Sequence, residues 1–316
     1  MKVAALAGGV GGAKLVDGLA RLLAPDDLTV IVNTGDDFRY CGLSISPDLD
    51  TVCYTLAGMA NQETGWGLQN ETWITLSQLK TMGAPAWFNL GDKDLATHLE
   101  RTRLLGDGVP LSSITRGFCE VWGVKPTILP MTDDPVATVV IDTAGNRLDF
   151  QEYFVKYHWA PAVKAIEFSD IDKANPAPGV LDALKDCDLV VICPSNPYVS
   201  VAPILALPGV LHIVQQKPVV AVSPIIGGAA VKGPLAKMIG ELTGQPATAG
   251  FAANYYKKLS ILTGYVLDTR DELEGTRLEG WGIIYETVDT LMISTDDRMR
   301  VANTVLELAS EICGDK

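Results

Sequence analysis

The sequence predicts an α/β fold built on a mainly parallel sheet. Residues 2–15 run from an apolar strand through four glycines into a helical pattern, which is the order of a strand–turn–helix unit. Short apolar strands at residues 28–32, 188–193 and 219–222 alternate with helical patterns, as crossover connections between parallel strands require. Residues 137–154 have the pattern of a β-hairpin, which indicates a smaller inserted α+β region.

The chain of 316 residues is long enough for one large domain or two smaller ones. Residues 66–122 read as helical and irregular, and the hairpin follows them. A proline-rich stretch at residues 174–179 marks a boundary. We therefore expect residues 1–60 and 175–316 to form the core and residues 61–174 to form the insert.

Composition and charge exclude several classes of protein. Hydrophobic residues make up 47% and charged residues 20% of the chain, which is typical of a globular protein. The formal charge of −13 disfavours a nucleic-acid partner, because such proteins usually carry a basic face. No apolar run approaches the ~20 residues that cross a bilayer, and the N-terminus lacks the pattern of a secretion signal. We predict a cytoplasmic protein without nucleic-acid or membrane partners, and six cysteines without a CxxC pair agree with a reducing compartment.

The first strand leads into a candidate phosphate-binding loop. Gly8, Gly9, Gly11 and Gly12 precede a helical pattern, and Lys14 adds a positive charge. Backbone N–H groups at a helix N-terminus attract anions, and glycine lets a phosphate approach because it has no Cβ. The spacing matches neither the P-loop motif, since no Ser or Thr follows Lys14, nor the three-glycine dinucleotide motif. A tight strand–helix turn without a ligand is the alternative.

Four aspartates follow the second predicted strand. Asp36 and Asp37 lie in the turn that ends this strand, and Asp48 and Asp50 lie at the start of the next helical pattern. Ligands gather where parallel strands end, so we expect these carboxylates at one sheet edge. They would repel one another without a cation, and we predict that Asp36, Asp37, Asp48 and Asp50 hold Mg²⁺. Asp36, Asp48 and Asp50 are also the catalytic candidates, while a helix cap is the alternative role for Asp48.

The two strands in the second half of the chain end in small polar loops. Ser195 and Asn196 follow one strand, and Ser223, Gly227 and Gly228 follow the other. Hydroxyl, amide and backbone donors in adjacent loops suit a nucleotide or phosphate ligand. Tight turns alone would also explain each loop.

A Gly-Asp turn precedes a helical pattern that carries His98. Lys93 lies at the start of this pattern, where the helix dipole disfavours a cation unless an anion meets it. A solvated surface lysine is the alternative interpretation. The three histidines are scattered along the chain, so the sequence predicts no histidine metal cluster.

Several of these stretches, taken in order, resemble the 2-phospho-L-lactate transferase family. The resemblance runs from residue 2 to about residue 295. It rests on the stretches Gly8-Gly9-Val10-Gly11-Gly12-Ala13-Lys14-Leu15, Val32-Asn33-Thr34, Ser46-Pro47-Asp48-Leu49-Asp50-Thr51, Leu90-Gly91-Asp92-Lys93-Asp94-Leu95-Ala96-Thr97-His98, Leu129-Pro130-Met131-Thr132-Asp133-Asp134-Pro135, Pro194-Ser195-Asn196-Pro197 and Ala221-Val222-Ser223-Pro224-Ile225-Ile226-Gly227-Gly228.

The resemblance implies a Rossmann-like, doubly wound core that binds nucleotide, with an insert that contributes to the acceptor site. It implies an enzyme of coenzyme F420 biosynthesis, with a guanylyl diphosphate carrying a small organic acid as donor and the deazaflavin Fo as acceptor. The ribityl hydroxyl of Fo attacks the phosphorus next to the acid, GMP leaves, and a dehydro or related form of F420-0 results. By the same resemblance Mg²⁺ is the cofactor, Asp50 and Lys93 bind Fo, and the protein is a homodimer.

Two other functions stay open at this stage. A related family of sugar-nucleotide-binding regulators shares the glycine stretch and the core, but the stretches at residues 46–51 and 90–98 favour the transferase. An NAD(P)-dependent oxidoreductase fits less well, because the second strand ends in Asn33 where an acid would bind ribose. No side chain is assignable to the choice between a lactyl, an enolpyruvyl and a glyceryl donor.

Overall fold

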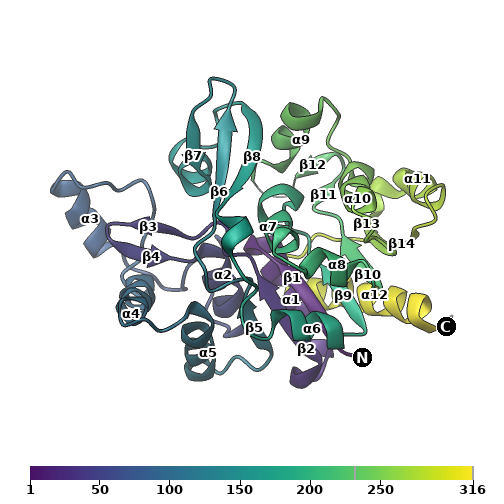
Figure 1. Ribbon diagram of the computed structural model, residues 1–316, viewed down its shortest axis with the longest axis horizontal. Helices are drawn as coiled ribbons and strands as arrows, with labels where there is room; N and C mark the ends of the chain where they lie inside the picture. The colour runs from purple at the N-terminus through teal and green to yellow at the C-terminus, as the bar shows by residue number, and fades with distance from the viewer. Residues whose placement is uncertain (231–232, 315–316) are drawn as a thin grey trace.

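A computed structural model of the chain describes residues 1–230 and 233–314 (Figure 1). Within this part, the centre is a seven-stranded parallel sheet in the order β14-β13-β10-β9-β1-β2-β5. Its strands are β1 (Val3–Ala7), β2 (Leu28–Val32), β5 (Thr127–Pro130), β9 (Leu189–Ile192), β10 (Val219–Val222), β13 (Gly264–Asp268) and β14 (Ile284–Val288).

The strand order reverses direction between β1 and β9. From β1 the chain proceeds to β2 and β5 on one side, and from β9 it proceeds to β10, β13 and β14 on the other. This is the doubly wound arrangement, and it confirms the predicted α/β fold. The reversal places a crevice at the carboxyl ends of β1 and β9, where ligands bind in folds of this class.

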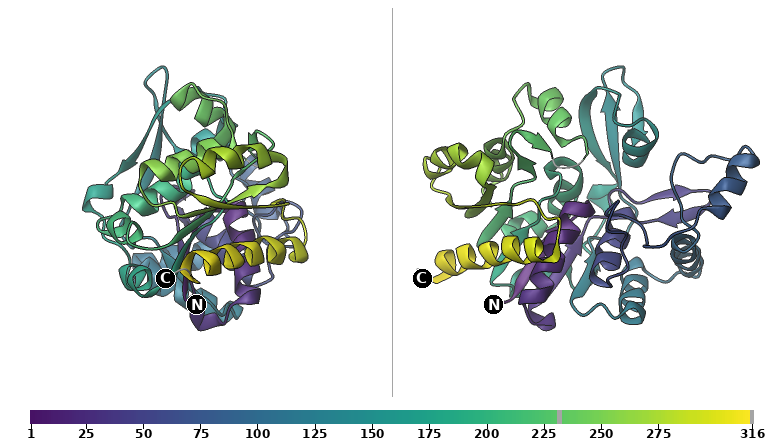
Figure 2. Two further views of the ribbon diagram at one scale, coloured as in Figure 1. Left: turned by 90° about the vertical axis from the view of Figure 1, so that its right-hand side faces the viewer. Right: turned by 180° about the vertical axis from the view of Figure 1, so that it is seen from behind.

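Two layers of helices cover the sheet because its strands are apolar on both faces. On one face, Val3, Ala5 and Ala7 of β1 contact a core that includes the helices α1, α2, α5 and α12. On the other face, Ala4 and Leu6 contact a core that includes α6, α7, α8, α10 and α11. Both views in Figure 2 show α12, in yellow, beside α1, in purple, and at an angle to it.

The described residues contain twelve α-helices. They are α1 (Gly9–Leu22), α2 (Pro47–Leu56), α3 (Ile74–Thr81), α4 (Asp94–Gly106), α5 (Leu111–Trp122), α6 (Val180–Asp186), α7 (Ala202–Ala206), α8 (Val210–Val214), α9 (Leu235–Thr243), α10 (Ala249–Lys258), α11 (Gly275–Glu279) and α12 (Thr295–Gly314). Five shorter helical turns are η1 (Pro25–Asp27), η2 (Glu152–Lys156), η3 (Ile171–Lys173), η4 (Pro197–Val201) and η5 (Thr269–Glu274). None of the described helices has the length and apolar character that a membrane crossing requires.

In the described part of the chain, three small antiparallel sheets lie outside the central one. They are the pair β3 (Phe38–Tyr40) and β4 (Leu43–Ile45), the sheet β7-β6-β8 with β6 (Ala137–Asp142), β7 (Arg147–Asp149) and β8 (Val163–Ser169), and the pair β11 (Ile225–Ile226) and β12 (Ala229–Ala230). The β3–β4 pair with α3 and the β7-β6-β8 sheet extend from the core in different directions (Figure 1). The strands β6 and β7 form the predicted hairpin, while β8, the third strand of its sheet, was not predicted.

The expected division of the chain differs from the observed packing at three places. The strand β5 falls within residues 61–174, yet it pairs with β2 at the edge of the central sheet. In the same range, Leu111 and Cys119 of α5 join the core under the sheet. The β3–β4 pair falls within residues 1–60, yet its aromatic side chains pack against Trp87 and Phe88 from the expected insert.

The glycine stretch forms the first turns of α1 rather than a loop. The helix begins at Gly9, and a Cβ built on Gly8 would lie 2.6 Å from the Cβ of Ser200. A Cβ built on Gly11 would overlap the carbonyl oxygen of Pro194. The glycines therefore let α1 approach the segment after β9, so a Gly11→Val variant would disturb packing as well as any ligand.

We predict that Gly18→Ala destabilises the protein by about 1–3 kcal/mol, because overpacking a close contact has this cost. A Cβ on Gly18 of α1 would overlap the backbone of Arg298 in α12. Gly117→Ala in α5 is the matched control, since nothing lies within 4 Å of its built Cβ. The control should stabilise by up to about 1 kcal/mol through helix propensity. Denaturant unfolding of both variants tests this, and equal stability of the two would contradict it.

Candidate active site

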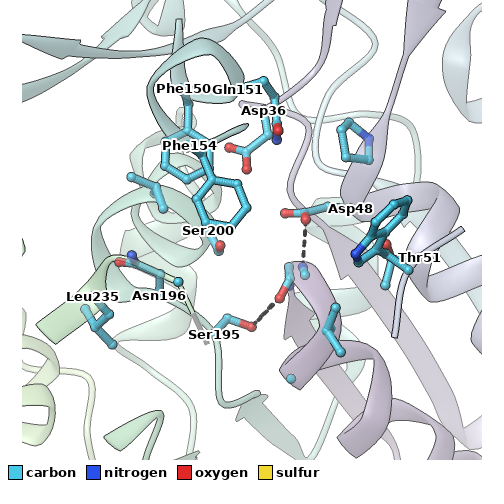
Figure 3. Close-up of a pocket in the computed structure, with 18 of the residues that line it drawn as sticks. Asp36, Asp48, Thr51, Phe150, Gln151, Phe154, Ser195, Asn196, Ser200 and Leu235 are labelled. Atoms are coloured by element: carbon cyan, nitrogen blue, oxygen red, sulfur yellow. Dashed lines mark hydrogen bonds between the residues drawn. The ribbon is translucent and has the colours of Figure 1, made fainter. Parts of the chain in front are cut away.

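A cavity of about 580 Å³ opens at the carboxyl ends of β1 and β9. Its walls come from the N-terminus of α1, the start of α2, residues 66–67, residues 150–159 and the loops after β9 and β10. Figure 3 shows Phe150, Phe154 and Asn196 on one side and Asp48 on the other. The cavity thus lies where the strand reversal predicts a ligand site.

The floor of the cavity joins α1 to the loop after β9. Ser195 Oγ donates to the carbonyl oxygen of Gly8 at 2.8 Å and accepts from Gly8 N–H at 3.2 Å. Gly9 N–H donates to Asp48 Oδ1 at 2.7 Å (Figure 3). An anion at the first turn of α1 is therefore already present in the protein, as the carboxylate of Asp48.

Asp36 and Asp48 form a pair around one amide group. Asn33 Nδ2 donates to Asp36 Oδ1 at 3.1 Å and to Asp48 Oδ2 at 2.9 Å. Burial raises the pKa of Asp48 to about 6, against the lowering effect of the Asn33 and Gly9 hydrogen bonds. Burial and the charge of Asp48 raise the pKa of Asp36 well above its usual value. Both carboxylates line the cavity, so two buried acids of raised pKa face the same space without a neighbouring cation among their hydrogen-bond partners in the described residues.

Asp37 and Asp50 have different surroundings. Asp37 Oδ2 accepts from Ser46 Oγ at 2.7 Å. Asp37 is not part of the cavity wall. Asp50 lines the cavity, but both of its oxygens accept from the guanidinium of Arg101. Burial acts to lower the pKa of Arg101, yet the charge and hydrogen bonds of Asp50 outweigh it and raise that pKa. Asp50 therefore has its own counter-charge, unlike Asp36 and Asp48.

Asp50, Asp94 and His98 offer ligand atoms within 4.8 Å of one another. His98 Nε2 lies 3.3 Å from Asp94 Oδ2, and Tyr54 donates its hydroxyl to Asp94 Oδ1 at 2.6 Å. The guanidinium of Arg101 already holds Asp50 in this group. A cation placed there would meet that positive charge, so the Asp36–Asp48 pair is the better candidate for a metal.

Aromatic rings form part of the cavity wall. The rings of Phe150 and Phe154 stack at a centroid distance of 5.6 Å, and Phe154 stacks on Trp159 at 5.3 Å. Trp66 and Tyr54 line the same cavity. Stacked rings of this kind suit planar ligands. The wall therefore offers ring faces to a planar ligand in the same cavity as the Asp36–Asp48 pair.

Most of the residues predicted for phosphate or nucleotide binding meet at the cavity. Gly8, Gly9, Gly11, Lys14, Ser195, Asn196 and Ser223 line it. Lys14 Nζ donates to the carbonyl oxygen of Met292 at 2.5 Å.

Four predicted site residues lie outside the cavity wall besides Asp37. A Cβ built on Gly12 would lie 2.9 Å from Ser195 Oγ, so Gly12 allows close packing. Gly227 N–H donates to Asp271 Oδ2 at 2.8 Å, and Gly228 belongs to the same turn. Lys93 is exposed, and its Nζ donates to the carbonyl oxygen of Gln69 at 3.1 Å.

Sequence reasoning missed several residues of the wall. Phe150 and Phe154 lie at the end of the predicted hairpin, where the sequence pattern does not distinguish a ring that stacks on a ligand from a ring in the core. Arg101 lies seven residues beyond the start of α4, and its contact with Asp50 spans 51 residues. No local sequence pattern predicts the contact between Arg101 and Asp50. The helical spacing of His98 and Arg101 does place both on one face of α4.

The fold and the cavity define a Rossmann-like α/β protein with an acidic, aromatic site at the switch point of its sheet. The chain belongs to the 2-phospho-L-lactate transferase CofD family, whose model matches residues 3–280. This confirms the resemblance found in the sequence, and the protein is a transferase enzyme of this type.

Relatives with two different names are similar to nearly the whole chain. The phosphoenolpyruvate transferase of Kitasatospora aureofaciens is 43% identical over 319 residues, covering 99% of each chain. The 2-phospho-L-lactate transferase of Methanosarcina mazei is 37% identical over 300 residues, covering 95% of this chain and 98% of the relative. Protein BH3568 of Bacillus halodurans, a solved structure, has a TM-score of 0.65 at 16% identity and covers 96% of this chain and 99% of its own. At that identity it supports the fold alone.

We predict that Asp36→Asn stabilises the metal-free protein, increasingly so as pH rises. A carboxyl whose pKa is higher in the folded than in the unfolded chain contributes most below its unfolded value, 3.8. That contribution is lost as the pH rises above 3.8 and through the raised pKa of Asp36 in the folded chain. The free energy of unfolding, measured in chelator across this range, should therefore fall more steeply for the wild type.

Asp26→Asn, which changes an exposed carboxylate, is the matched control and should alter the free energy of unfolding little at any pH. If the difference in free energy of unfolding between wild type and Asp36→Asn shrinks as the pH rises, the pKa of Asp36 is not raised in the folded protein.

Proposed function

We propose that the protein transfers a phospho-organic-acid group from a guanylyl diphosphate donor to the deazaflavin Fo in coenzyme F420 biosynthesis. The observation that carries the proposal is the pair of buried carboxylates, Asp36 and Asp48, in a cavity that is also lined by aromatic rings. Family membership supports the reaction type. The ribityl hydroxyl oxygen of Fo bonds to the phosphorus next to the organic acid, its proton is lost, and the bond to GMP breaks.

The donor lies on the side of α1 and the loops after β9 and β10. Ser195, Asn196 and Ser223 offer hydroxyl and amide groups there, and Phe154 offers a ring face for guanine. Lys14 faces the same cavity from α1 and brings a positive charge toward the diphosphate. Phosphoryl transfer depends chiefly on positioning and charge stabilisation, and these residues supply the positioning.

Asp36 and Asp48 are the residues that would hold Mg²⁺. Two adjacent buried carboxylates of raised pKa fit a cation, since oxygen ligands suit Mg²⁺ and its charge would offset their repulsion. When bound, Mg²⁺ supplies neutralisation of the phosphate charge. Asn33 keeps both carboxylates turned to the same space through its amide. Asp37 and Asp50, which were expected to share the metal, are held instead by Ser46 and Arg101.

The acceptor lies on the side of Asp50, Trp66 and Tyr54, which border the cavity from α2 and residues 66–67. Both oxygens of Asp50 accept from Arg101, and Asp50 can also accept a hydrogen bond from the acceptor. Among the organic acids, we propose enolpyruvate, because the relatives of 41–44% identity carry the name phosphoenolpyruvate transferase. A cytoplasmic location and a homodimer stay predictions.

The test is to incubate the protein with Fo, Mg²⁺ and each of the three donors in turn and to weigh the product. The enolpyruvyl donor should give the phosphodiester of enolpyruvate with Fo, together with GMP, at a higher rate than the lactyl or glyceryl donor. Asp48→Asn should lower turnover by at least about 100-fold, a typical loss for a group that stabilises charge in a transition state. Wild-type turnover that persists in excess chelator would contradict the assignment of the metal. The absence of product with all three donors would contradict the proposed function.

Lys93→Ala is expected to weaken Fo binding by roughly 10- to 100-fold, the effect of removing one charge-assisted hydrogen bond. The family resemblance assigns Lys93 to the deazaflavin, and its Nζ contacts Gln69, close in sequence to Trp66 of the wall. Titrations of Fo and GDP decide it, with GDP binding nearly unchanged. Lys80→Ala, which removes an exposed lysine from α3, is the control. If Fo binding is unchanged in Lys93→Ala, Lys93 is a solvated surface lysine and does not bind Fo.

A further inference from the structure

A buried guanidinium lies behind the acceptor side of the cavity. Arg101 of α4 has an exposed fraction of 3% and belongs to no part of the cavity wall. Its Nη1 donates to Asp50 Oδ2 at 3.1 Å, and its Nη2 donates to Asp50 Oδ1. Asp50 therefore stands between Arg101 and the cavity.

Other groups hold Arg101 in place. Its Nη1 also lies 3.3 Å from His98 Nδ1 and 3.4 Å from the carbonyl oxygen of Ser44, and its guanidinium lies 6.0 Å from the centre of the Phe118 ring. These contacts come from α4, β4 and α5, so three elements fix the orientation of one side chain. The two-pronged pairing with Asp50 then fixes the plane of the carboxylate, as a single ammonium could not.

A buried ion pair is seldom kept for stability, because an apolar pair of similar volume often serves the fold as well. This one places a carboxylate of 6% exposure on a cavity wall. Each carboxylate oxygen keeps a lone pair beyond the one that Arg101 engages, so Asp50 can still accept a hydrogen bond from the cavity. The arrangement suits a fixed acceptor of hydrogen bonds and is poorly suited to a metal ligand.

We propose that Arg101 is a positioning residue for the acceptor substrate: it orients Asp50 toward the acceptor and keeps it away from the cation held by Asp36 and Asp48. The inference rests on the proposed function. It assigns the four predicted carboxylates to separate tasks, with Asp50 serving the acceptor alone. Arg101 acts through Asp50 and does not itself meet either substrate.

The experiment titrates Fo, by its fluorescence, and GDP with Mg²⁺ against the wild type, Arg101→Lys and Arg101→Gln. Arg101→Lys keeps the charge but loses the two-pronged hydrogen bonding to both oxygens of Asp50, so Fo binding should weaken about tenfold or more. Arg101→Gln should weaken it further, by up to about 100-fold. GDP binding should stay within about twofold of the wild type in both variants, and the Mg²⁺ concentration that GDP binding requires should not move. Arg103→Gln is the matched control, since Arg103 lies on the same helix but pairs with Glu100 and Asp107 on the surface.

Melting temperatures of all variants separate positioning from folding. If Arg101→Gln does not fold, Arg101→Lys decides the matter, because it leaves no uncompensated charge beside Asp50. Equal losses for Fo and GDP in Arg101→Lys would mark a purely structural pair and overturn the inference, and so would wild-type binding of Fo by that variant. A wild type that binds GDP but not Fo would overturn the proposed function instead.

Discussion

The side-chain amide of Asn33 is the contact on which the rest of the site depends. Asn33 is fully buried at the end of β2. Its Nδ2 donates to Asp36, to Asp48 and, at 3.3 Å, to the carbonyl oxygen of Val199, while its Oδ1 accepts from Gly35 N–H at 2.9 Å. One side chain therefore joins the loop after β2, the start of α2 and the segment after β9. An acid at this position, as in dinucleotide-binding sheets, would add a third negative charge to the pair.

The electrostatics of the site follow from this contact. The chain carries a net charge of −13 and buries several carboxylates at one sheet edge. Asp50 is matched by Arg101. Among the described residues, Asp36 and Asp48 share the amide of Asn33, and Asp48 also accepts from Gly9 N–H. Unmatched buried carboxylates are costly unless a cation or a proton joins them. The site therefore has one carboxylate paired with Arg101 beside the proposed acceptor and a second, unmatched pair suited to a cation. The sequence assigns both tasks to a single cluster.

The sequence predicts the parts of the fold that local pattern determines. The apolar runs of β1, β2, β9 and β10 and the start of α2 at Pro47 agree with the structure. The strand β14 was not predicted, because it lies at the sheet edge with its side chains partly exposed and has no continuous apolar run. The strand β13 was not predicted either, although it is fully buried, because its apolar run, Tyr265-Val266-Leu267, is only three residues long.

The candidate site could be predicted only in so far as its residues follow strand ends. Asp36, Ser195 and Asn196 follow strands of the parallel sheet, and Asp48 joins them from the first turn of α2. The pairing of Asp50 with Arg101 depends on how α4 packs against β4 and α5, which no spacing along the chain encodes. Lys93 has a position that the helix pattern predicts, but the direction of its side chain depends on the segment around Gln69.

The measurement that tests the account most directly is a crystal structure with Mn²⁺ in place of Mg²⁺ and with GDP, read by the anomalous signal of the metal. The account predicts one anomalous peak in the cavity, with Asp36 and Asp48 as its protein ligands and with Asp50 still paired to Arg101. A peak bounded by Asp50, Asp94 and His98, with Arg101 displaced, would contradict it.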